Sequence, residues 1–577
     1  MNDNTKPVPV HKMEREKALA AERRKILSMS PEKALEAIAE HPYPVTLVQS
    51  MAEEELYFLV HHIGPDDALP ILGLASNSQW EYLIDMEGWD RDRMAPFSMT
   101  QWLQRLLQAD NDRFTHWITK EKFDDLVFYL HRNIELHIRE YDQDPGEIGE
   151  DFYSEDQTYY VRLRPYPETQ KPMQEERDLF VKDLLRRVSV FDYTYYRNLL
   201  LEASTIIPAE AEEELYRLRK VRLAEKGILP LEEAVGVYQP LQAGDLAGRP
   251  KPPTFGGRSV DTYPLPIQTE AAGQSTGLFG QALAQIHDEG TLQRLQAEFA
   301  ALCNQIISAD QLKVRDREIL ARVVRKAGDF ISLGLEKIQS QSAPDRPYAG
   351  PGLLQTRFLA DLFRVGYGCA LALKWRTDKW RQTAWFAAQG LPLGFWGEQW
   401  LGLLGGLLLK KPLCYNHERT GPNYREFASL TDIIRTEEEL KTIIAFDDLL
   451  GLMALETASI EKSGFLTYQN LILTLWADHE LGLCEPGQPP VPMTLGQFRR
   501  FFKTLWTSDD RPRRIGDTVR ERFLNWLAQR SGLSAYEIAE RMAPALEQLF
   551  STIEQELGEV RSSDLDPRYI QLFLLRS

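Results

Sequence analysis

Residues 27–94 are divided by regularly spaced helix-terminating residues, and this division constrains the fold more than any other feature of the chain. Clusters of Gly, Pro, Asn, Ser or acidic residues recur about every 12 to 14 residues. The segments between them carry two to four aliphatic residues at helical spacing. A helix of two or three turns is not stable alone in water. The sequence therefore predicts short helices that pack side by side, as in a helical solenoid.

The residues at the breaks are typical of helix ends. Residues 30–32 (Ser-Pro-Glu) predict an N-cap, a first-turn proline and an acidic first turn. Residues 64–67 (Gly-Pro-Asp-Asp) predict the end of one helix and the start of the next. Residues 76–78 (Ser-Asn-Ser) offer three candidate caps before Trp80. Each break is therefore expected to join two short helices by a tight turn.

The pattern of Pro-Glu or Pro-Asp followed by a Leu-rich segment, as in MSPEKALEAI and GPDDALPILGL, resembles the cytosolic N domain of MgtE-type magnesium transporters. That domain is a small superhelix of short helices, so the resemblance implies a superhelical N-terminal region of about 70 residues. We expect no counterpart of the transporter's pore and nucleotide-sensing domains.

A second resemblance is broader. The segments LASNSQWEYLIDMEGWDRDRM, GILPLEEAVGVYQPL and, at the end, DPRYIQLFLL are similar to a bacterial family of unknown function. This resemblance implies no residue roles.

The rest of the chain predicts a mainly α fold with one small β-hairpin. Longer helices are expected at 97–139, where FDDLVFYLHRNIELHIRE is interpreted as a single helical stretch. The segment DFYSEDQTYYVRLRP alternates aromatic and polar residues and predicts the hairpin. Helical spacing returns at 175–226 and again from 278 to 575.

Residues 239–276 are rich in Pro and Gly and predict a linker or an extended strap. We therefore expect four regions. They are a helical repeat domain at 1–140, a hairpin and helical extension at 141–238, the strap at 239–276, and a larger C-terminal helical domain at 277–577.

Charge and cysteine content restrict the environment and the ligands of the protein. The net charge of -18 repels phosphate backbones, so we expect no nucleic-acid partner. The four cysteines lie far apart in the sequence, which is typical of a reducing cytosol and gives neither a disulfide framework nor a structural zinc site. The N-terminus has no apolar core of signal-peptide length. These features predict a cytoplasmic protein.

The most apolar segment, WFAAQGLPLGFWGEQWLGLLGGLLL, approaches the length of a membrane span. Its glycines, its proline, its glutamines and Glu398 interrupt it, and the fully apolar run at 400–409 is half of what a bilayer requires. We expect a buried core helix here and no membrane insertion.

Two motifs suggest catalysis or metal binding. Residues 273–277 (GQSTG) match the G-x-S-x-G nucleophile elbow around Ser275, with His287, His417 and His479 following as possible partners. The preceding segment is a poor core strand, so a flexible linker is the favoured interpretation. His131 and Glu135 are four residues apart, whereas His137 would point elsewhere on the expected helix, which disfavours a zinc site.

The acidic run at 140–156 is the candidate cation site. Hard cations prefer carboxylate oxygens, and the run contains Glu140, Asp142, Asp144, Glu147, Glu150, Asp151, Glu155 and Asp156. An EF-hand counted from Asp142 fails because Glu147 occupies the glycine position. A solvated loop is favoured over a weak divalent-cation site.

The first of two aromatic segments that could form a binding surface lies near the C-terminus. The helix predicted at 495–506 places Phe498, Phe502 and Trp506 on one side, with Arg499, Arg500 and Lys503 bordering it. Such spacing predicts rings that face a core and cations that face solvent, although aromatics interleaved with basic residues can also bind single-stranded nucleic acid.

Five tryptophans between Trp375 and Trp400 predict core packing, with an apolar ligand pocket as the alternative.

These observations favour a cytosolic protein-interaction, scaffold or regulatory protein with another protein as its partner, and they favour a role without catalytic activity over an enzymatic one. We assign no catalytic, cofactor-binding or metal-binding residue and no cofactor. Two alternatives stay open. One is an enzyme or small-ligand binder with its site in the C-terminal helical domain, and the other is a divalent-cation-responsive regulator acting through the acidic run.

Overall fold

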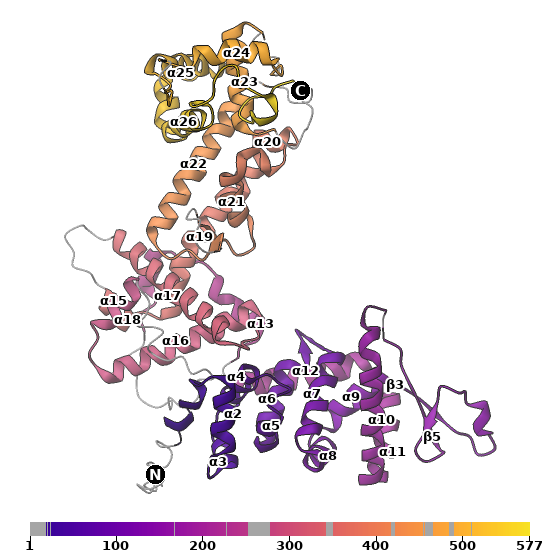
Figure 1. Cartoon of the computed structure of the whole chain (residues 1–577). Helices are drawn as coiled ribbons and strands as arrows, with labels where there is room; N and C mark the ends of the chain where they lie inside the picture. Colours follow the sequence, from indigo (N-terminus) through magenta and orange to yellow (C-terminus); the bar gives the residue numbers. More distant parts are fainter. Residues whose placement is uncertain are drawn as a thin grey trace.

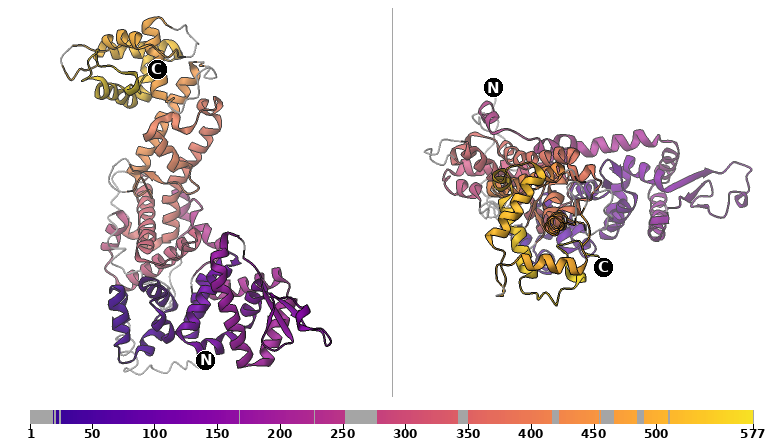
Figure 2. Two further views of the ribbon diagram at one scale, coloured as in Figure 1. Left: turned by 45° about the vertical axis from the view of Figure 1, so that its right-hand side comes forward. Right: turned by 90° about the horizontal axis from the view of Figure 1, so that it is seen from above.

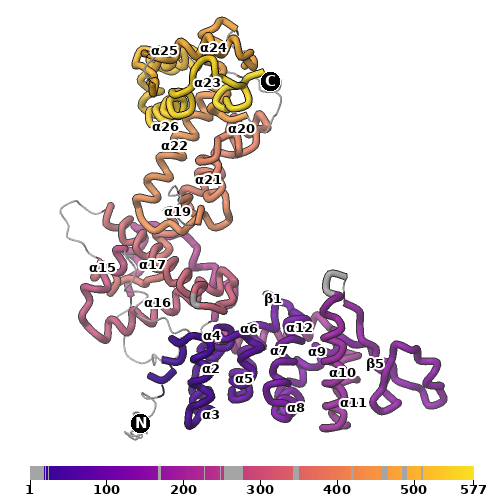
Figure 3. The backbone as a smooth tube through the Cα atoms, viewed as in Figure 1, coloured from indigo at the N-terminus to yellow at the C-terminus, as the bar shows by residue number. Residues whose placement is uncertain are grey.

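A computed structural model describes residues 19, 21–23, 25–166, 168–226, 228–251, 277–341, 350–416, 422–453, 455, 466–483, 490–508 and 511–576. The fold is mainly α, as predicted, and its strands are few and short. Its buried apolar side chains form two clusters, one from Ile26 to Leu223 and the other from Ala234 to Phe573. Among the described residues, the members of the first cluster all precede those of the second in the chain, whose order the colours of Figure 3 follow. The four regions expected from the sequence stay predictions.

The first cluster lies inside a row of helices, here called the N-terminal array (Figure 1). Its helices are α2 (Pro31–Ala39), α3 (Pro44–Gln49), α4 (Glu53–Ile63), α5 (Leu69–Leu74), α6 (Asn77–Glu87), α7 (Pro96–Ala109), α8 (Asn111–Lys120), α9 (Phe123–Asn133), α10 (Gln174–Phe191), α11 (Tyr193–Thr205) and α12 (Pro208–Glu225). Two short strands, β1 (Trp89–Asp90) and β2 (Arg93–Met94), form a hairpin between α6 and α7.

The short helices begin and end where the sequence predicts. Helix α2 begins at Pro31, and α4 ends before Gly64, whose φ of 108° is readily adopted only by glycine. Of the three candidate caps, Ser76 is the N-cap of α6, and its side chain accepts a hydrogen bond from the Gln79 backbone. The predicted short helices of residues 27–94 are therefore present.

Side-chain hydrogen bonds to backbone carbonyls connect these short helices. Gln79 is buried in α6, and its Nε2 donates to the carbonyls of Val48 and Met51, at 2.9 Å each. The indole of the buried Trp80 donates to the Leu72 carbonyl at 2.8 Å. These bonds join α6 to the ends of α3 and α5, where helix carbonyls have room for a further donor.

The second cluster begins with α13 (Leu231–Ala234) and lies among longer helices. The helices that follow are η3 (Val235–Tyr238), η4 (Ala243–Gly248), α15 (Leu278–Ala284), α16 (Glu289–Asp310), α17 (Arg317–Ser340), α18 (Gly350–Thr356) and α19 (Leu359–Thr383). Helices α17 and α19 approach closely at Gly334 and Gly366. A Cβ atom at Gly366 would lie 2.0 Å from the Phe330 carbonyl oxygen, so the two backbones are in contact.

Helices α19, α21 and α22 form a stalk that leads to a C-terminal domain at the end opposite the array (Figures 1 and 2). The elements of the stalk and of this domain are α20 (Trp385–Ala388), η6 (Leu393–Trp396), α21 (Gly397–Leu408), β6 (Cys414–Tyr415), β7 (Tyr424–Arg425), α22 (Leu430–Leu452), α23 (Tyr468–Leu481), α24 (Leu495–Thr504), α25 (Asp517–Ser531), α26 (Ala535–Leu557) and η8 (Pro567–Tyr569).

The segment at 385–409 differs from its prediction. The expected single core helix is divided into α20, η6 and α21, because a turn at Gly390 and a φ of 77° at Gly397 interrupt it. In the described ranges, no helix has both the length and the apolar character needed to cross a bilayer.

Candidate functional site

A small β-sheet projects from the array beyond its helices (Figures 1 and 2). Its strands are β3 (Ile134–Ile138), β4 (Tyr153–Ser154) and β5 (Tyr159–Leu163), and β5 lies in the middle and pairs antiparallel with both neighbours. The predicted hairpin is therefore one side of a three-stranded sheet. We call the sheet and its connections, residues 134–163, the arm.

Strand β3 corrects the interpretation of FDDLVFYLHRNIELHIRE as one helix. Helix α9 ends at Asn133, and the next five residues pair with β5, with Ile134 opposite Leu163 and Ile138 opposite Tyr159. The residues of β3 alternate apolar and polar, Ile-Glu-Leu-His-Ile, which is the pattern of a strand with one covered face. The helical pattern before it hid this signal.

The base of the arm is fixed by a buried arginine. The Arg177 side chain is fully buried, and its Nη1 donates to Asn133 Oδ1 at 2.9 Å, while Nη2 donates to the Arg164 carbonyl at 2.6 Å. Its guanidinium also lies over the Tyr166 ring, 4.3 Å from the ring centre. One side chain of α10 thus binds the end of α9 and the segment that follows β5.

Asp156 shapes the turn between β4 and β5. Its Oδ1 accepts hydrogen bonds from the backbone N–H groups of Thr158 and Tyr159, at 2.9 Å each, and Oδ2 accepts one from the Tyr193 hydroxyl at 2.9 Å. Partial burial alone would raise the pKa of Asp156, but these bonds outweigh it and lower the pKa below its usual range. The Asp156 carboxylate therefore stabilises the turn and connects the arm to α11.

The far end of the arm combines unpaired negative charge with exposed apolar groups. Tyr141 is fully exposed, at 105% of its reference area, and Ile138 is 47% exposed. The same stretch of the arm has seven exposed carboxylates that make no ion pair with a described residue: Glu140, Asp142, Asp144, Glu147, Glu150, Asp151 and Glu155. This surface can attract a cationic partner and offers an aromatic ring for contact.

The carboxylates of the arm are not gathered around one point. Asp144 Oδ1 accepts a hydrogen bond from the Gly146 backbone at 2.9 Å, as Asp156 does in its own turn. Among the described residues, no group of three or more His, Cys, Asp or Glu side chains is placed to hold a metal ion.

The residues considered for zinc binding have separate partners. His131 Nδ1 lies 2.8 Å from the Ala203 carbonyl oxygen, and His137 Nε2 lies 3.0 Å from Gln143 Oε1. Glu135 forms an ion pair with Arg162 across the sheet.

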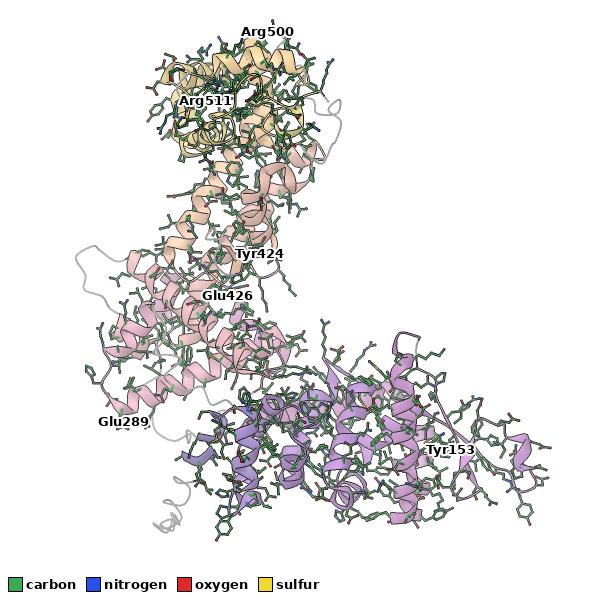
Figure 4. The ribbon with its side chains drawn as sticks, viewed as in Figure 1. Tyr153, Glu289, Tyr424, Glu426, Arg500 and Arg511 are labelled. Carbon is green, nitrogen blue, oxygen red and sulfur yellow. The ribbon has the colours of Figure 1, made fainter. Side chains whose placement is uncertain are left out.

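The other predicted motifs fall in different places. Residues 273–276 of the GQSTG motif and His417 lie outside the described residues. His287 is exposed after α15, and His479 lies in α23 beside Trp526. In α24, Phe498 and Phe502 are buried and Arg500 and Lys503 are exposed, as predicted, and Figure 4 shows Arg500 at the outer end of the C-terminal domain. Arg499 and Trp506 differ from the prediction, since both are half-buried and Arg499 donates to the Ser563 carbonyl at 3.4 Å.

The tryptophan-rich region contributes one residue to a cavity of about 430 Å³ between α22 and α26. Trp385 lines it together with Asp447, Asp448 and Arg541. Asp447 is buried and accepts hydrogen bonds from the Trp380 indole and from the backbone of Trp385 and Phe386, while Trp396 and Trp400 pack in the core. Sequence reasoning missed the acidic and basic lining because these residues are remote from one another in the chain.

A second group of titratable side chains lies where the stalk begins. Asp310 accepts a hydrogen bond from the Tyr238 hydroxyl at 2.6 Å and pairs with Lys326, at 3.1 Å, and with Lys411, while Lys326 also pairs with Glu426 at 3.1 Å. Burial, and then the charge of Asp310, raises the pKa of Tyr238 far above its usual range. These side chains satisfy one another and join five separate segments; Figure 4 marks Glu426 among them.

The fold and the arm define the class: a mainly helical protein with an elongated body and one projecting β arm. The model of a family of unknown function, DUF6178, matches residues 11–576. The chain belongs to this family. The predicted membership of an uncharacterised family is therefore confirmed, while the bacterial origin and the MgtE resemblance stay predictions. No curated protein and no solved structure matches the chain.

Proposed function

We propose that this protein is a protein-interaction scaffold whose arm docks a partner protein through a basic surface. The observation that carries the proposal is the fully exposed Tyr141 among seven unpaired carboxylates, held on a sheet whose base is fixed by a buried arginine. An exposed tyrosine contributes a large contact area at a low cost in conformational entropy.

Charge and rigidity act at different stages of this docking. The unpaired carboxylates attract a cationic surface over distances of about 10 Å, the screening length near 0.1 M salt, and so raise the rate of encounter. The hydrogen bonds of Arg177 and Asp156 hold the sheet in place before binding, so little order has to be gained on contact. We expect a salt-sensitive complex.

The alternatives have weaker support. An enzyme or small-ligand binder would use the cavity at Trp385 or the side chains around Asp310, but the latter are paired with one another. A cation-responsive regulator would use the acidic run, where two carboxylates are occupied by backbone N–H groups. The cytoplasmic location is kept as part of the proposal.

The test compares capture of partners by the unmodified protein and by an arm variant. The variant combines Tyr141→Ala with Glu140→Gln and Asp142→Asn, three exposed positions outside the hydrogen bonds that form the sheet. Tagged proteins are incubated with lysate of the native cell at low and at 0.3 M added salt, and the captured proteins are identified by mass spectrometry. We expect the arm variant, and the high salt, to remove at least about 90% of a partner, since loss of a central anchor costs about 2 kcal/mol.

A matched variant on another part of the array controls for loss of charge. Glu36→Gln, Glu40→Gln and Tyr43→Ala change two exposed glutamates and an exposed tyrosine near α2 and α3. This variant is expected to retain the partner. Equal capture by the arm variant and the unmodified protein would contradict the proposal, as would co-purification of a metabolite with no enriched protein.

A further inference from the structure

The contact between the array and the rest of the molecule, here called the junction, contains a buried carboxylate held from both sides. Glu87, at the end of α6, has a side chain that is 2% exposed and accepts a hydrogen bond from Tyr57 of α4. From the loop between α16 and α17, Arg315 Nη2 lies 2.6 Å from Glu87 Oε2, and Lys313 Nζ lies 3.5 Å from it. His61 Nε2 lies 3.4 Å from Oε1.

Glu87 is therefore ionised in the closed junction. Burial by itself raises the pKa of Glu87, but the close contact with His61, the hydrogen bonds from Arg315 and Tyr57 and the charge of Lys313 outweigh it and hold the pKa far below its usual range. Glu87 with Arg315 and Lys313 forms one half of the junction, and Glu87 stays ionised near neutral pH.

The other half is a cavity of about 30 Å³ with polar groups that lack such partners. It is lined from the array by Glu54, Tyr57, Phe58, Tyr82, Met86 and Ile228, and from the other side by Asn304, Ile307 and Val314. Asn304 is 4% exposed, and its Nδ2 has no hydrogen-bond partner among the described residues. The volume suffices for about two water molecules.

Glu54 is 5% exposed in this cavity. Burial raises its pKa from 4.5 to about 7, although its own backbone N–H lowers it in part. The charged and titratable groups around it are Glu53, Glu55, Tyr57 and His61 on α4, Tyr82, Asp85 and Glu87 on α6, Lys226 after α12, and Lys313 and Arg315 across the junction. Lys226 is already paired with Glu53 at 2.8 Å, and Asp85 with Arg222 at 2.7 Å.

We propose that the junction is a proton-controlled hinge, closed while Glu54 carries a proton and opened when Glu54 ionises. Among the described residues the two apolar clusters share no member, so the array can turn away without breaking either of them. Opening brings water to Glu54 and to Asn304, and it separates Glu87 from Arg315 and Lys313. The hinge thus changes where the arm is presented relative to the stalk.

The direction of the pH response follows from linkage. In the closed state Glu54 binds its proton more tightly than in the open, hydrated state, where it titrates near 4.5. The contribution of Glu54 to the stability of the closed state is fully present below pH 4.5 and is lost as the pH rises through about 7. Across this window the ratio of closed to open molecules falls by about 300-fold at most.

The test measures the radius of gyration of the full chain by small-angle X-ray scattering at pH 5.5 and pH 8.5. We expect the unmodified protein to be more extended at pH 8.5. Glu54→Gln, which has the shape of the protonated side chain, is expected to show the pH 5.5 value at both pH values. The protection of the α16 peptide that contains Asn304, measured by hydrogen exchange relative to the intrinsic exchange rate at each pH, gives a second measurement and should fall with pH only where Glu54 is present.

Two further variants test whether the response depends on Glu54 in particular and on the ion pair of Glu87. Asp478→Asn removes another buried acid, with a pKa raised to about 6 by burial in the C-terminal domain, and should keep the full pH response of the junction. Arg315→Gln leaves Glu87 without its closest cation and should increase extension and exchange at both pH values. The hinge is refuted if Glu54→Gln responds to pH as the unmodified protein does, or if the unmodified protein changes in neither measurement.

Discussion

The two apolar clusters of this protein are built in different ways. In the array, helices of 6 to 11 residues such as α3, α5 and α6 are connected by buried side chains that bond to backbone carbonyls. In the second cluster, α17 and α19 have 24 and 25 residues and meet where Gly334 faces Gly366. The packing of the array therefore depends on hydrogen bonds at helix ends. The packing of α17 against α19, here called the long pair, depends on the absence of side chains at the two glycines.

Helix length explains the contrast. A short helix has unsatisfied N–H and C=O groups over most of its length, so a neighbouring side chain that bonds to them fixes both its position and its ends. A long helix satisfies most of its own backbone, and its stability comes from the area it buries against a partner. Close approach of two long helices increases that area, and glycine permits it.

The largest expected effect is that of Gly366→Ala. The new Cβ would lie 2.0 Å from the Phe330 carbonyl oxygen and 2.9 Å from the Gly334 nitrogen, so α19 has to move away from α17. We expect the unfolding free energy of the second cluster to fall by about 3 kcal/mol or more, at the upper end for an overpacked core. Urea unfolding followed by far-UV circular dichroism measures this loss.

A second glycine in the same cluster serves as the control. A Cβ at Gly394, in η6, meets nothing within 4 Å, so Gly394→Ala is expected to change the unfolding free energy by less than about 0.5 kcal/mol. Equal effects of the two substitutions would show that close backbone contact is not what stabilises the long pair.

Much of the fold was predictable because its signals are local. Capping residues and spacing within one segment predict the helix starts at Pro31 and near Ser76 and the burial of Phe498 and Phe502 in α24. Strand β3 was missed even though its residues alternate, because an amphipathic helix precedes it without a Gly or Pro between them.

The functional surfaces were predictable only in part. The acidic run was identified as exposed, but its position at the end of a sheet depends on Arg177, which lies after it in the chain. The ion pair between Glu87 and Arg315 joins residues that are 228 positions apart, and the cavity at Glu54 depends on Asn304. One sequence contains no signal for such pairs, because each residue taken alone is an ordinary surface or core type.

The second prediction concerns the polar connections of the array. Gln79→Ala removes the two hydrogen bonds to the carbonyls of Val48 and Met51 and leaves both acceptors without this partner. We expect the array to lose about 2 kcal/mol of unfolding free energy, because two buried hydrogen bonds are lost at about 1 kcal/mol each. Protection of α4 and α6 amides in hydrogen exchange should fall with it, while α17 and α19 keep theirs.

The control for this change is a glutamine on the surface of the same region. Gln49 Nε2 donates to the Leu74 carbonyl at 3.2 Å, but the contact is exposed, and water replaces it when Gln49→Ala is made. Its expected cost is less than about 0.5 kcal/mol. If the two variants were equally stable, burial of the polar connections would have no role in holding the short helices together.

The smallest expected effect separates helix caps in the two clusters. Ser76 caps α6 and Ser534 caps α26, each in a reciprocal arrangement with the residue three positions later. The first turn of α6 contains the buried Gln79 and Trp80, so it cannot fray without breaking the contacts of the array, and Ser76→Ala should cost about 1 kcal/mol. In α26 the residue that corresponds to Trp80 is Ile538, which is also buried, but the residue that corresponds to Gln79 is Glu537, which is not, so Ser534→Ala should cost less, about 0.5 kcal/mol. Hydrogen exchange of the two first turns and urea unfolding of the two variants measure these costs. A larger loss of unfolding free energy for Ser534→Ala would show that helix length, and not the burial of the first turn, decides what a cap contributes.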